Sequence, residues 1–523
     1  MTQQKSENRV VPKDQRKLDV TRDDEHLEGG KAVPVNEGSC ELERTCATAE
    51  RRAADPAQSN DVAEKGLPCS VALAAPKAQV DTRASTTATM EELVKQLGTA
   101  FDRVASNKGA PGPDKKSVNE VREHLDSILP KLANELLSGT YLPGNIRRVW
   151  IPKSDGGQRG LGIPNVIDRV VQEATRRVLE PLYEPAFHPS SHGFREGRSC
   201  HTAIAEASEY LLMGYGIVVD LDVEKFYDRV CHQRLLAKLA ERVLDRRILK
   251  LIAKMLRAKV IMPDGVVVNT AEGLPQGGPL SPLLSNIVLD ELDQELARRG
   301  HKFVRYADDL NIYVRSVRAG QRVMASVSGF IEKRLRLKVN QGKSAVDRPE
   351  KRHFLGFCLR VDSLAETVEV TLSKRSIERI TERIVELTPR NWGGSMRSCI
   401  RQINAYLKGW FGFFGICTAG TDRILQRLDA HIRRRLRALQ LKQWKCKRTI
   451  ARKLVKLGVR FKTAWWRVYA GRKSLWALSH DPAVYRGLRN AYFAERGLVS
   501  LVELLRNKLS TKDAPAQLML TRG

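Results

Sequence analysis

Several features that would place this chain in a familiar class are missing from its sequence. Its nine cysteines lie far apart and none forms a Cys-x-x-Cys pair, so the sequence predicts neither a zinc site nor a disulfide framework. Scattered thiols are typical of the reducing cytosol, and we expect a cytoplasmic protein. The N-terminus lacks the apolar segment of a secretion signal. No apolar run approaches the roughly 20 residues of a membrane-spanning helix, so no membrane partner is expected.

Aromatic residues are missing from the first 88 positions. This stretch contains no Trp, Tyr or Phe and is rich in Ala and in polar or charged residues. A segment that can bury so little apolar surface cannot offset the entropy lost on ordering. We therefore predict that residues 1–88 form a disordered polar extension.

Acidic residues are scarce toward the other end of the chain. The formal net charge is +29, and residues 1–89 contribute −2 of it, with 13 Lys and Arg against 15 Asp and Glu. Residues 401–490 hold 22 Lys and Arg against 3 Asp and Glu, a local charge of +19. This density favours a nucleic-acid partner. The alternative is a basic surface that only keeps the protein soluble.

Strand and helix patterns mix in the middle of the chain, between residues 145 and 360, which predicts an α+β domain. After about residue 370 the pattern is mostly helical and basic, and six of the seven tryptophans lie there. The expected elements of the middle region are a buried strand at 216–223, a helical stretch at 234–256, a hairpin at 261–268 and a helix at 283–299.

Two adjacent acids, Asp308 and Asp309, interrupt residues 303–314, which otherwise have the composition of a strand. Strands disfavour Asp, so the pair predicts a tight turn between two strands. Such a turn can project carboxylates into a cleft, where oxygen ligands hold Mg²⁺. Tyr-x-Asp-Asp arises by chance in about one chain in twenty of this length, so a solvated turn is the alternative.

A third acid strengthens the prediction of a metal site. Asp222 ends the expected buried strand, and Asp228 follows six residues later. A carboxylate at a strand end and a pair on a neighbouring hairpin could converge, and clustered carboxylates repel unless cations neutralise them. Two Mg²⁺ ions would suit such a cluster, since a metal pair stabilises both oxygens of a phosphoryl displacement.

Seven blocks of residues, in this order, resemble the reverse transcriptase/maturase encoded by group II introns. An ordered set of motifs is far more specific than any one of them. The resemblance covers roughly residues 90–490. The blocks are 151–164 (IPKSDGGQRGLGIP), 192–199 (HGFREGRS), 222–230 (DVEKFYDRV), 273–282 (GLPQGGPLSP), 306–314 (YADDLNIYV), 338–343 (KVNQGK) and 354–357 (FLGF).

The resemblance implies an α+β right-hand polymerase, with fingers and a palm built on an antiparallel sheet, followed by a helical thumb and maturase domain. The implied domains are a polar extension at 1–88, fingers and palm at 89–357, thumb and maturase (X) domain at 358–490, and a C-terminal helix and tail at 491–523. Since no paired cysteines follow the match, we expect none of the zinc-containing endonuclease modules that many family members carry.

The resemblance also implies the polymerase site. Asp222, Asp308 and Asp309 match the catalytic ligands of two Mg²⁺ ions, with the Val223 carbonyl as a backbone ligand. The residues that match nucleotide-binding positions of the family are Lys153, Arg159, Tyr227 and Gln276. An Arg fork and a Lys charge suit triphosphate oxygens. A ring at Tyr227 would clash with a ribose 2′-hydroxyl; the alternative is a plain core aromatic.

Further basic residues match RNA-contacting segments of the family. Arg195 and Arg198 are expected at the template backbone, although a structural salt bridge is an equal alternative for either one. Lys and Arg side chains are interleaved with Trp in the thumb and maturase region. The basic side chains can neutralise phosphates, and the Trp rings can stack on unpaired nucleobases. The expected RNA-binding residues there are Arg433, Arg434, Arg435, Lys442 and Lys445.

The resemblance predicts an RNA-directed DNA polymerase that copies its group II intron RNA into cDNA and also assists splicing as a maturase. Its expected partners are the intron RNA, a DNA target or primer and deoxynucleoside triphosphates; the oligomeric state is not predicted. The alternative is a domesticated reverse transcriptase of the retron, diversity-generating or CRISPR-associated kind. The maturase-like segment argues against that alternative, since most of those enzymes lack it.

Overall fold

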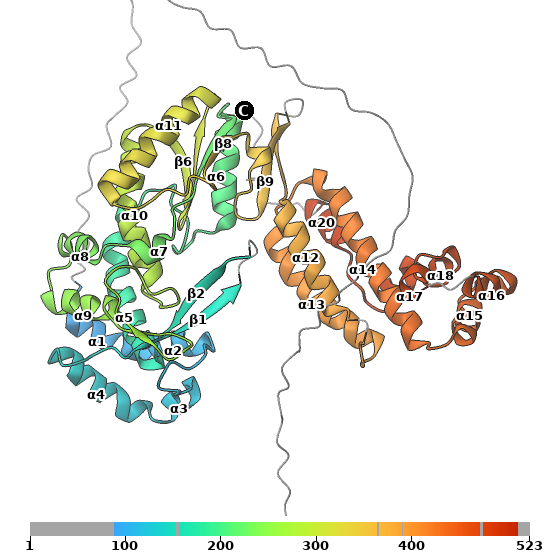
Figure 1. Ribbon diagram of the computed structural model, residues 1–523, viewed down its shortest axis with the longest axis horizontal. Helices are drawn as coiled ribbons and strands as arrows, with labels where there is room; N and C mark the ends of the chain where they lie inside the picture. The colour runs from blue at the N-terminus through green and yellow to red at the C-terminus, as the bar shows by residue number, and fades with distance from the viewer. Residues whose placement is uncertain (1–87, 153–155, 363–365, 390, 471–473, 511–523) are drawn as a thin grey trace, which may run out of the picture. The chain divides into compact units, whose positions relative to one another are not determined.

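A computed structural model describes residues 88–152, 156–362, 366–389, 391–470 and 474–510 of the 523-residue chain. The predicted polar extension, apart from Ala88, and the predicted tail beyond residue 510 lie outside these described residues. The described part combines helices and sheets and then becomes helical, which confirms the predicted α+β class (Figure 1).

The first described region is a helical layer beside a small sheet. The sheet, which we call the fingers sheet, has the strand order β2-β1-β4-β5; β1 is parallel to β4 and the other pairs are antiparallel. Its strands are β1 (Ile146–Pro152), β2 (Gln158–Ile163), β4 (Val260–Ile261) and β5 (Val267–Val268). The helices are α1 (Met90–Lys95), α2 (Leu97–Ser106), α3 (Val118–Glu123), α4 (Leu125–Leu137) and α5 (Val166–Tyr183).

The second sheet, which we call the palm sheet, has the order β6-β7-β3-β8 and is antiparallel throughout. Successive residues of β3 enter opposite cores: Val219 packs with the cluster that includes α10 and α11, and Val218 with the cluster that includes α6. The sheet is therefore covered on both faces (Figure 1). The elements are β3 (Ile217–Leu221), β6 (Lys302–Tyr306), β7 (Asp309–Val314), β8 (Ala345–Asp347), α6 (Cys200–Leu212), α10 (Ser281–Arg298) and α11 (Val317–Phe330).

The helical stretch expected at 234–256 is two helices, α8 (His232–Ala240) and α9 (Arg246–Leu256). The second helix begins after Asp245, whose side chain accepts the Arg247 N–H and caps α9. The same carboxylate accepts the Met90 N–H at the start of α1, 2.9 Å away. The expected hairpin at 261–268 is confirmed by the pairing of β4 with β5. A short helix, α7 (Phe226–Arg229), follows β3.

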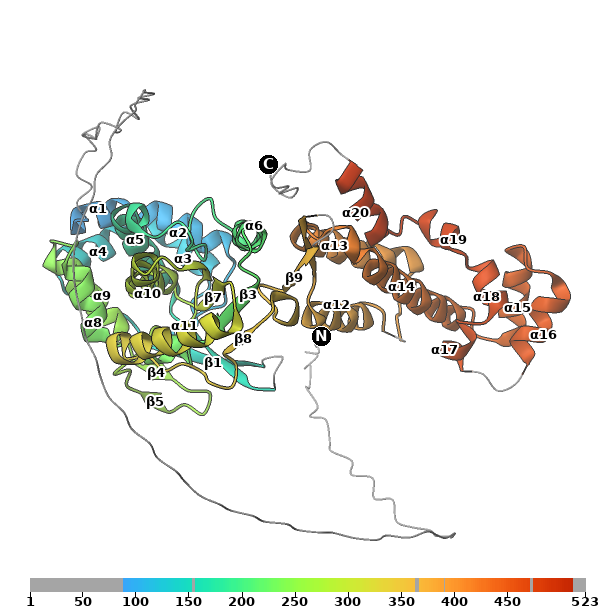
Figure 2. The same cartoon turned by 90° about the horizontal axis from the view of Figure 1, so that it is seen from above.

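The region after the palm sheet is a hairpin followed by helices. The hairpin strands are β9 (Phe357–Asp362) and β10 (Thr367–Leu372). Figure 2 shows α12 to α14 running side by side, with α15 to α18 gathered near the end of α14. The helices are α12 (Lys374–Leu387), α13 (Met396–Phe414), α14 (Asp422–Gln443), α15 (Lys447–Lys456), α16 (Phe461–Tyr469), α17 (Leu475–Leu478), α18 (Pro482–Gly487), α19 (Asn490–Ala494) and α20 (Leu501–Ser510).

Two expected absences can be examined in the described residues. The six cysteines there, at 200, 231, 358, 399, 417 and 446, are all free thiols. In the same part of the chain, no helix has both the length and the apolar character needed to cross a bilayer.

Candidate active site

The three predicted catalytic acids lie at one end of the palm sheet. Leu221 at the end of β3 pairs with Leu310 near the start of β7. Asp222 follows Leu221 and Asp309 precedes Leu310, so the antiparallel register places the two acids side by side at the same end of adjacent strands. Asp308 precedes Asp309 in the turn between β6 and β7. The register therefore gathers residues that are 86 positions apart in the chain, as the pattern of acids predicted.

The turn that carries Asp308 is a two-residue hairpin connection. Tyr306 pairs with Asp309, which leaves Ala307 and Asp308 as the central residues, and Ala307 has φ +58. A residue with a Cβ seldom adopts this conformation, so neighbouring structure must hold it. Gly193 is one such neighbour, because a side chain there would collide with the Ala307 backbone nitrogen. The glycine of the 192–199 block thus lets the backbone pack directly against the turn formed by residues 306–309, which we call the catalytic turn after its two predicted catalytic acids.

Asp222 is held through its backbone by the segment that follows α11. Its N–H donates to the Ser344 hydroxyl at 3.0 Å, and its carbonyl accepts the Asn340 N–H at 2.8 Å. The next residue, Val223, faces Val339 in an antiparallel bridge. The hydrogen bonds of this bridge are made by the residues that flank the pair, so the ladder leaves the Val223 carbonyl available as a backbone ligand.

The electrostatics of the site suit a bound cation. Desolvation, together with the negative charges of Asp308, Asp220 and Asp222, raises the pKa of Asp309 to about 7. Burial also raises the pKa of Asp308, which the positive charge of Arg159 opposes. Neighbouring carboxylates that repel one another form the hard oxygen donor set that Mg²⁺ prefers. Across the described residues, however, no three His, Cys, Asp or Glu side chains are already drawn together as in a formed metal site.

One further acid lies beside this cluster. Asp220, two residues before Asp222, accepts two hydrogen bonds from Arg352, at 2.6 and 2.9 Å. Burial raises the pKa of Asp220, and Arg352 lowers it. Asp220 therefore adds negative charge near Asp309, and its ion pair with Arg352 partly offsets that charge.

Two of the predicted nucleotide-binding residues, Arg159 and Tyr227, lie near the same acids. Arg159 is an exposed residue of β2, and its charge lowers the pKa of both Asp308 and Asp309. Tyr227 on α7 is half-buried. Burial raises the pKa of its hydroxyl, and the negative charge of Asp308 raises that pKa as well. Lys153 lies outside the described residues.

The loop that carries Gln276 is fastened to the fingers sheet. The Gly162 N–H of β2 donates to the Gln276 carbonyl at 2.6 Å. Gly277 has φ +121, and a side chain there would collide with the Gly162 carbonyl oxygen. The loop also contacts α7, since the Leu274 N–H donates to the Tyr227 carbonyl at 2.6 Å. These contacts bring Arg159, Gln276 and Tyr227 to adjoining elements.

Arg195 has a different position from the one expected. Its guanidinium is 5% exposed and pairs with Glu184 at 2.8 Å, while it also donates to the carbonyls of His188 and Ser191. These partners and the Glu184 carbonyl occupy its donors, so the structural ion pair is the alternative that the structure favours. The prediction of a template contact does not fit Arg195. Arg198 is partly exposed and donates to the Pro189 carbonyl.

The five basic residues expected to bind RNA lie on or just after α14 and differ in their surroundings. The Arg434 guanidinium lies 3.9 Å from the centre of the Trp476 ring. Arg435 donates to the hydroxyl and the carbonyl of Thr388 at 2.9 and 2.5 Å, so it ties α14 to the end of α12. Lys442 donates to Asn391 at 2.7 Å. Arg433 is partly exposed and Lys445 is exposed.

An exposed aromatic surface lies just beyond these bases on α16. Phe461, Trp465 and Tyr469 are spaced four residues apart, and consecutive ring centres are 5.6 Å from each other. Trp466, on a neighbouring face, is 65% exposed, and Phe461 is 64% exposed. Residues 430–480, which contain α15 and α16, hold sixteen Lys and Arg and no Asp or Glu. Exposed aromatic rings in a segment rich in Lys and Arg and free of Asp and Glu are typical of surfaces that bind unpaired nucleotides.

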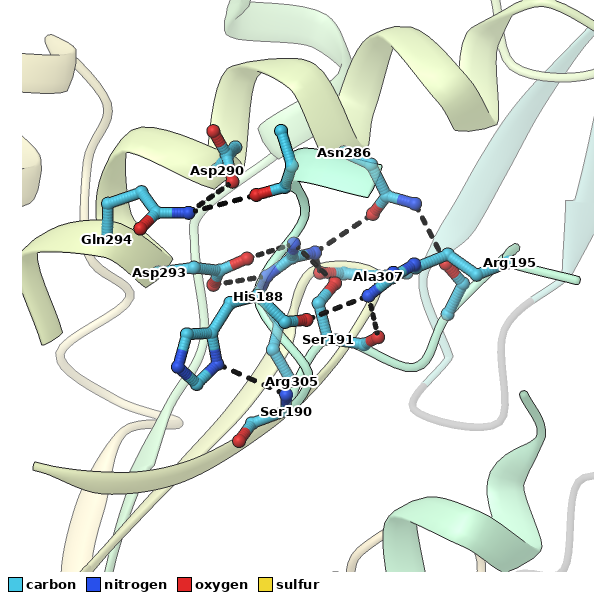
Figure 3. Close-up of polar contacts among 12 residues, drawn as sticks. His188, Ser190, Ser191, Arg195, Asn286, Asp290, Asp293, Gln294, Arg305 and Ala307 are labelled. Atoms are coloured by element: carbon cyan, nitrogen blue, oxygen red, sulfur yellow. Dashed lines mark hydrogen bonds and ion pairs between the residues drawn. The ribbon is translucent and has the colours of Figure 1, made fainter. Parts of the chain in front are cut away.

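The main residue that the sequence analysis missed is Arg305, the last but one residue of β6. Its side chain is 1% exposed and donates to the Ala307 carbonyl of the catalytic turn at 2.9 Å (Figure 3). The sequence contains a signal for this position. Arg305 lies two residues after Phe303 in the strand, so both side chains point to the same, core-facing side of the sheet. A base at such a position predicts a buried acidic partner, which is Asp293 of α10.

Comparison with known proteins agrees with this arrangement. Residues 151–359 match the family model for reverse transcriptase (RNA-dependent DNA polymerase), and residues 377–457 match the model for the group II intron maturase-specific domain. The polymerase match contains all three acids, and the maturase match contains α14.

Curated relatives point the same way. Protein YkfC of Escherichia coli is 35% identical over 282 residues, which cover 46% of this chain and 74% of that protein. The group II intron-encoded protein LtrA of Lactococcus lactis is 35% identical over 39% of this chain and 34% of its own length. The putative COX1/OXI3 intron 2 protein of Saccharomyces cerevisiae is 29% identical over 51% of this chain. The chain thus spans only 34% and 38% of the two intron proteins.

A solved structure, a partial Cas6-RT-Cas1–Cas2 complex, is 22% identical with a TM-score of 0.30, over 46% of this chain and 42% of that chain. The identity and coverage of the first relative, together with the two ordered domain matches, settle the family. The chain belongs to the group II intron-encoded reverse transcriptases/maturases, whose polymerase domain is an RNA-directed DNA polymerase.

Proposed function

We propose that this protein copies group II intron RNA into cDNA by two-metal-ion nucleotidyl transfer and also binds that RNA to assist its splicing. The observation that carries the polymerase part is the convergence of Asp222, Asp308 and Asp309 at one edge of the palm sheet. Their number and mutual repulsion fit two Mg²⁺ ions, with the Val223 carbonyl as a backbone ligand. When bound, such ions stabilise the attacking and leaving oxygens of the phosphoryl displacement.

The chain's own residues then bind and orient the reactants. Arg159 extends from β2 toward the carboxylates, where its fork of donors suits the triphosphate of an incoming deoxynucleotide. Lys153 is proposed to add a point charge to the same triphosphate. Tyr227 presents a half-buried ring that favours deoxyribose by excluding a 2′-hydroxyl, and the Gln276 loop supports the nucleotide from the other side.

The RNA-binding part rests on the charge and aromatic surface of residues 430–480. Its sixteen Lys and Arg, with no Asp or Glu among them in the sequence, attract phosphates, and the aromatic rings of α16 offer faces on which nucleobases can stack. Arg433 and Lys445 remain proposed RNA contacts, together with Arg434 and Lys442, whose side chains also contact Trp476 and Asn391. For Arg435 we propose mainly the support of this surface, because Thr388 engages its guanidinium.

The polymerase proposal is tested by primer extension on an RNA template with deoxynucleotides and Mg²⁺. We expect the wild-type protein to extend the primer and Asp308→Asn to fail. Asp228→Asn is the matched control, because Asp228 is an exposed acid only six residues from Asp222. If Asp308→Asn extends the primer at the wild-type rate, the proposed site is wrong.

The splicing proposal needs a separate measurement, the rate of intron excision at low Mg²⁺ with and without the protein. We expect Asp308→Asn to promote splicing normally, because its RNA-binding surface is intact. A variant with Lys445→Gln, Arg448→Gln and Arg452→Gln, three exposed positions, should lose that effect while it still extends an annealed primer. A wild-type protein that polymerises but never promotes splicing would favour the domesticated alternative.

A further inference from the structure

The palm contains one fully buried ion pair directly beneath the catalytic turn. Arg305 of β6 and Asp293 of α10 are 1% and 0% exposed, and two hydrogen bonds join them, at 2.7 and 2.5 Å. Burying two charges costs several kcal/mol each, and a hydrophobic pair of similar size is often at least as stable. Stability alone therefore gives little reason for a charged pair at this position.

The remaining donors of Arg305 explain the position better. They reach the Ala307 carbonyl at 2.9 Å, the Asn286 side-chain oxygen at 3.0 Å and the Ser191 hydroxyl at 2.7 Å (Figure 3). One planar fork thus joins the catalytic turn, α10 and the segment that precedes Gly193. Lysine could not reproduce this, because it has a single nitrogen in place of a planar fork.

A second set of contacts closes around the same turn. The Asn286 amide donates to the Gly193 carbonyl at 2.8 Å, and Gly193 packs against the Ala307 backbone. The segment before it is paired with β6, since the His192 N–H donates to the Arg305 carbonyl at 2.8 Å. The turn is therefore held from below by Arg305 and from the side by Gly193, and Asn286 contacts both.

Helix α10 is the rigid base of this network. Asn286 and Asp293 are seven residues apart, so both project from one face of the helix across two turns. Both are buried, at 1% and 0% exposure. The helix starts directly after the Gln276 loop, and the Ser281 hydroxyl at its first turn donates to the Pro275 carbonyl at 2.6 Å. Helix α10 thus supports both the Gln276 loop and the catalytic turn.

We propose that Arg305 is a positioning residue for the catalytic turn: held by Asp293 and Asn286, it fixes the Ala307–Asp308 peptide so that the turn acids meet Asp222 at metal-binding separation. The strained φ of Ala307 is what this clamp must maintain. The inference rests on the proposed two-metal function and specifies which residues outside the metal ligands set the affinity for the ions.

The test compares Arg305→Lys with the wild-type protein in two measurements. One is the Mg²⁺ concentration that half-saturates primer extension, recorded with the deoxynucleotide KM; the other is Mn²⁺ binding to the protein alone, followed by electron paramagnetic resonance. Residues that orient metal ligands typically change metal affinity by about 10–100-fold when replaced. We expect a shift of that size in both measurements, a lower kcat and an unchanged deoxynucleotide KM.

Two more variants separate positioning from folding. Ser191→Ala removes one Arg305 contact without adding volume, and should shift Mg²⁺ dependence in the same direction by a smaller factor. Arg176→Lys alters a partly buried ion pair on α5, with Glu173 at 2.8 Å, and should leave Mg²⁺ dependence unchanged. Thermal unfolding of each variant shows whether it is folded.

The proposal is overturned if folded Arg305→Lys and Ser191→Ala proteins keep wild-type Mg²⁺ half-saturation and Mn²⁺ affinity, even if their Tm falls. A structural ion pair would behave in that way. A wild-type protein that binds no Mn²⁺ and extends no primer would instead overturn the proposed function itself, so the two failures are distinguishable.

Discussion

The catalytic turn and the basic region at 430–480 use charge in opposite ways. Next to the turn, the charges of Arg305 and Asp293 are buried, at 1% and 0% exposure, and have defined partners. The sequence of residues 430–480 contains sixteen Lys and Arg and no Asp or Glu, and the basic side chains on α15 are exposed. Buried, paired charges set positions, whereas many exposed charges set affinity by their sum. Single substitutions should therefore be severe in the first region and graded in the second.

The largest effect is expected for Asp308→Asn. Loss of one ligand of a metal pair removes several kcal/mol of transition-state stabilisation, which is about a thousandfold or more in rate. The same change removes a repelling charge, so the Tm in EDTA should not fall. Primer extension and thermal unfolding of the same preparation measure both. A large fall in Tm would mean that the lost activity reflects unfolding.

Gly193→Ala should have the next largest effect. Its new methyl group would collide with the Ala307 nitrogen, so the turn must shift or the segment must move away. Overpacking of this kind costs about 1–3 kcal/mol in stability. We expect primer extension to fall by more than the loss of folded protein accounts for. Gly216→Ala is the control, since a Cβ there meets no atom within 4 Å. Equal effects of both changes would contradict a special role for Gly193.

A moderate effect on nucleic-acid binding is expected for Trp466→Ala. Its ring is 65% exposed, so removal should barely change the Tm. Base stacking on an aromatic ring contributes about 1–3 kcal/mol per base. The affinity for single-stranded RNA should fall by that amount, with the same slope of log K against log salt. Leu244→Ala, at an 82% exposed apolar side chain between α8 and α9, should leave RNA affinity unchanged.

The smallest effect is expected for one exposed base, such as Lys453→Gln on α15. Each phosphate contact on a single strand contributes about 0.7 to the salt slope. The variant should lose affinity several-fold at low salt and flatten the slope by about that amount, while primer extension at saturating RNA is unchanged. If Lys453→Gln and Trp466→Ala changed the slope equally, charge and stacking could not be separate contributions.

Much of the active site could be predicted from the sequence, because Asp within strand-forming residues has few structural uses. The register of β3 and β7 then places Asp222 beside Asp309, as expected. The role of Arg195 could not be predicted, because its partner Glu184 is one of many acids and only the fold brings them together. The break between α8 and α9 was missed because the apolar spacing continues through it, and the capping by Asp245 is a local signal.

The domain boundaries predicted at 88, 357 and 490 stay predictions. The metal-ligand role of Val223, the nucleotide contact of Gln276 and the RNA contact of Arg198 also stay predictions, because each involves a bound ion, nucleotide or RNA. The burial of Arg305 in β6, by contrast, could have been predicted from the alternation of inward and outward side chains along the strand.

The meeting of two glycine backbones, Gly162 of β2 and Gly277 of the Gln276 loop, limits how this protein can diverge. Neither position has room for a side chain, because Gly277 faces the Gly162 carbonyl and a side chain on Gly162 would collide with Ile146. In a saturation library selected for polymerase activity, both should tolerate almost no replacement, although neither carries a functional group. A variant that moves β2 away to accept a larger residue would also lose the hydrogen bond to Gln276. Variation in substrate choice must therefore come from the side chains around this junction.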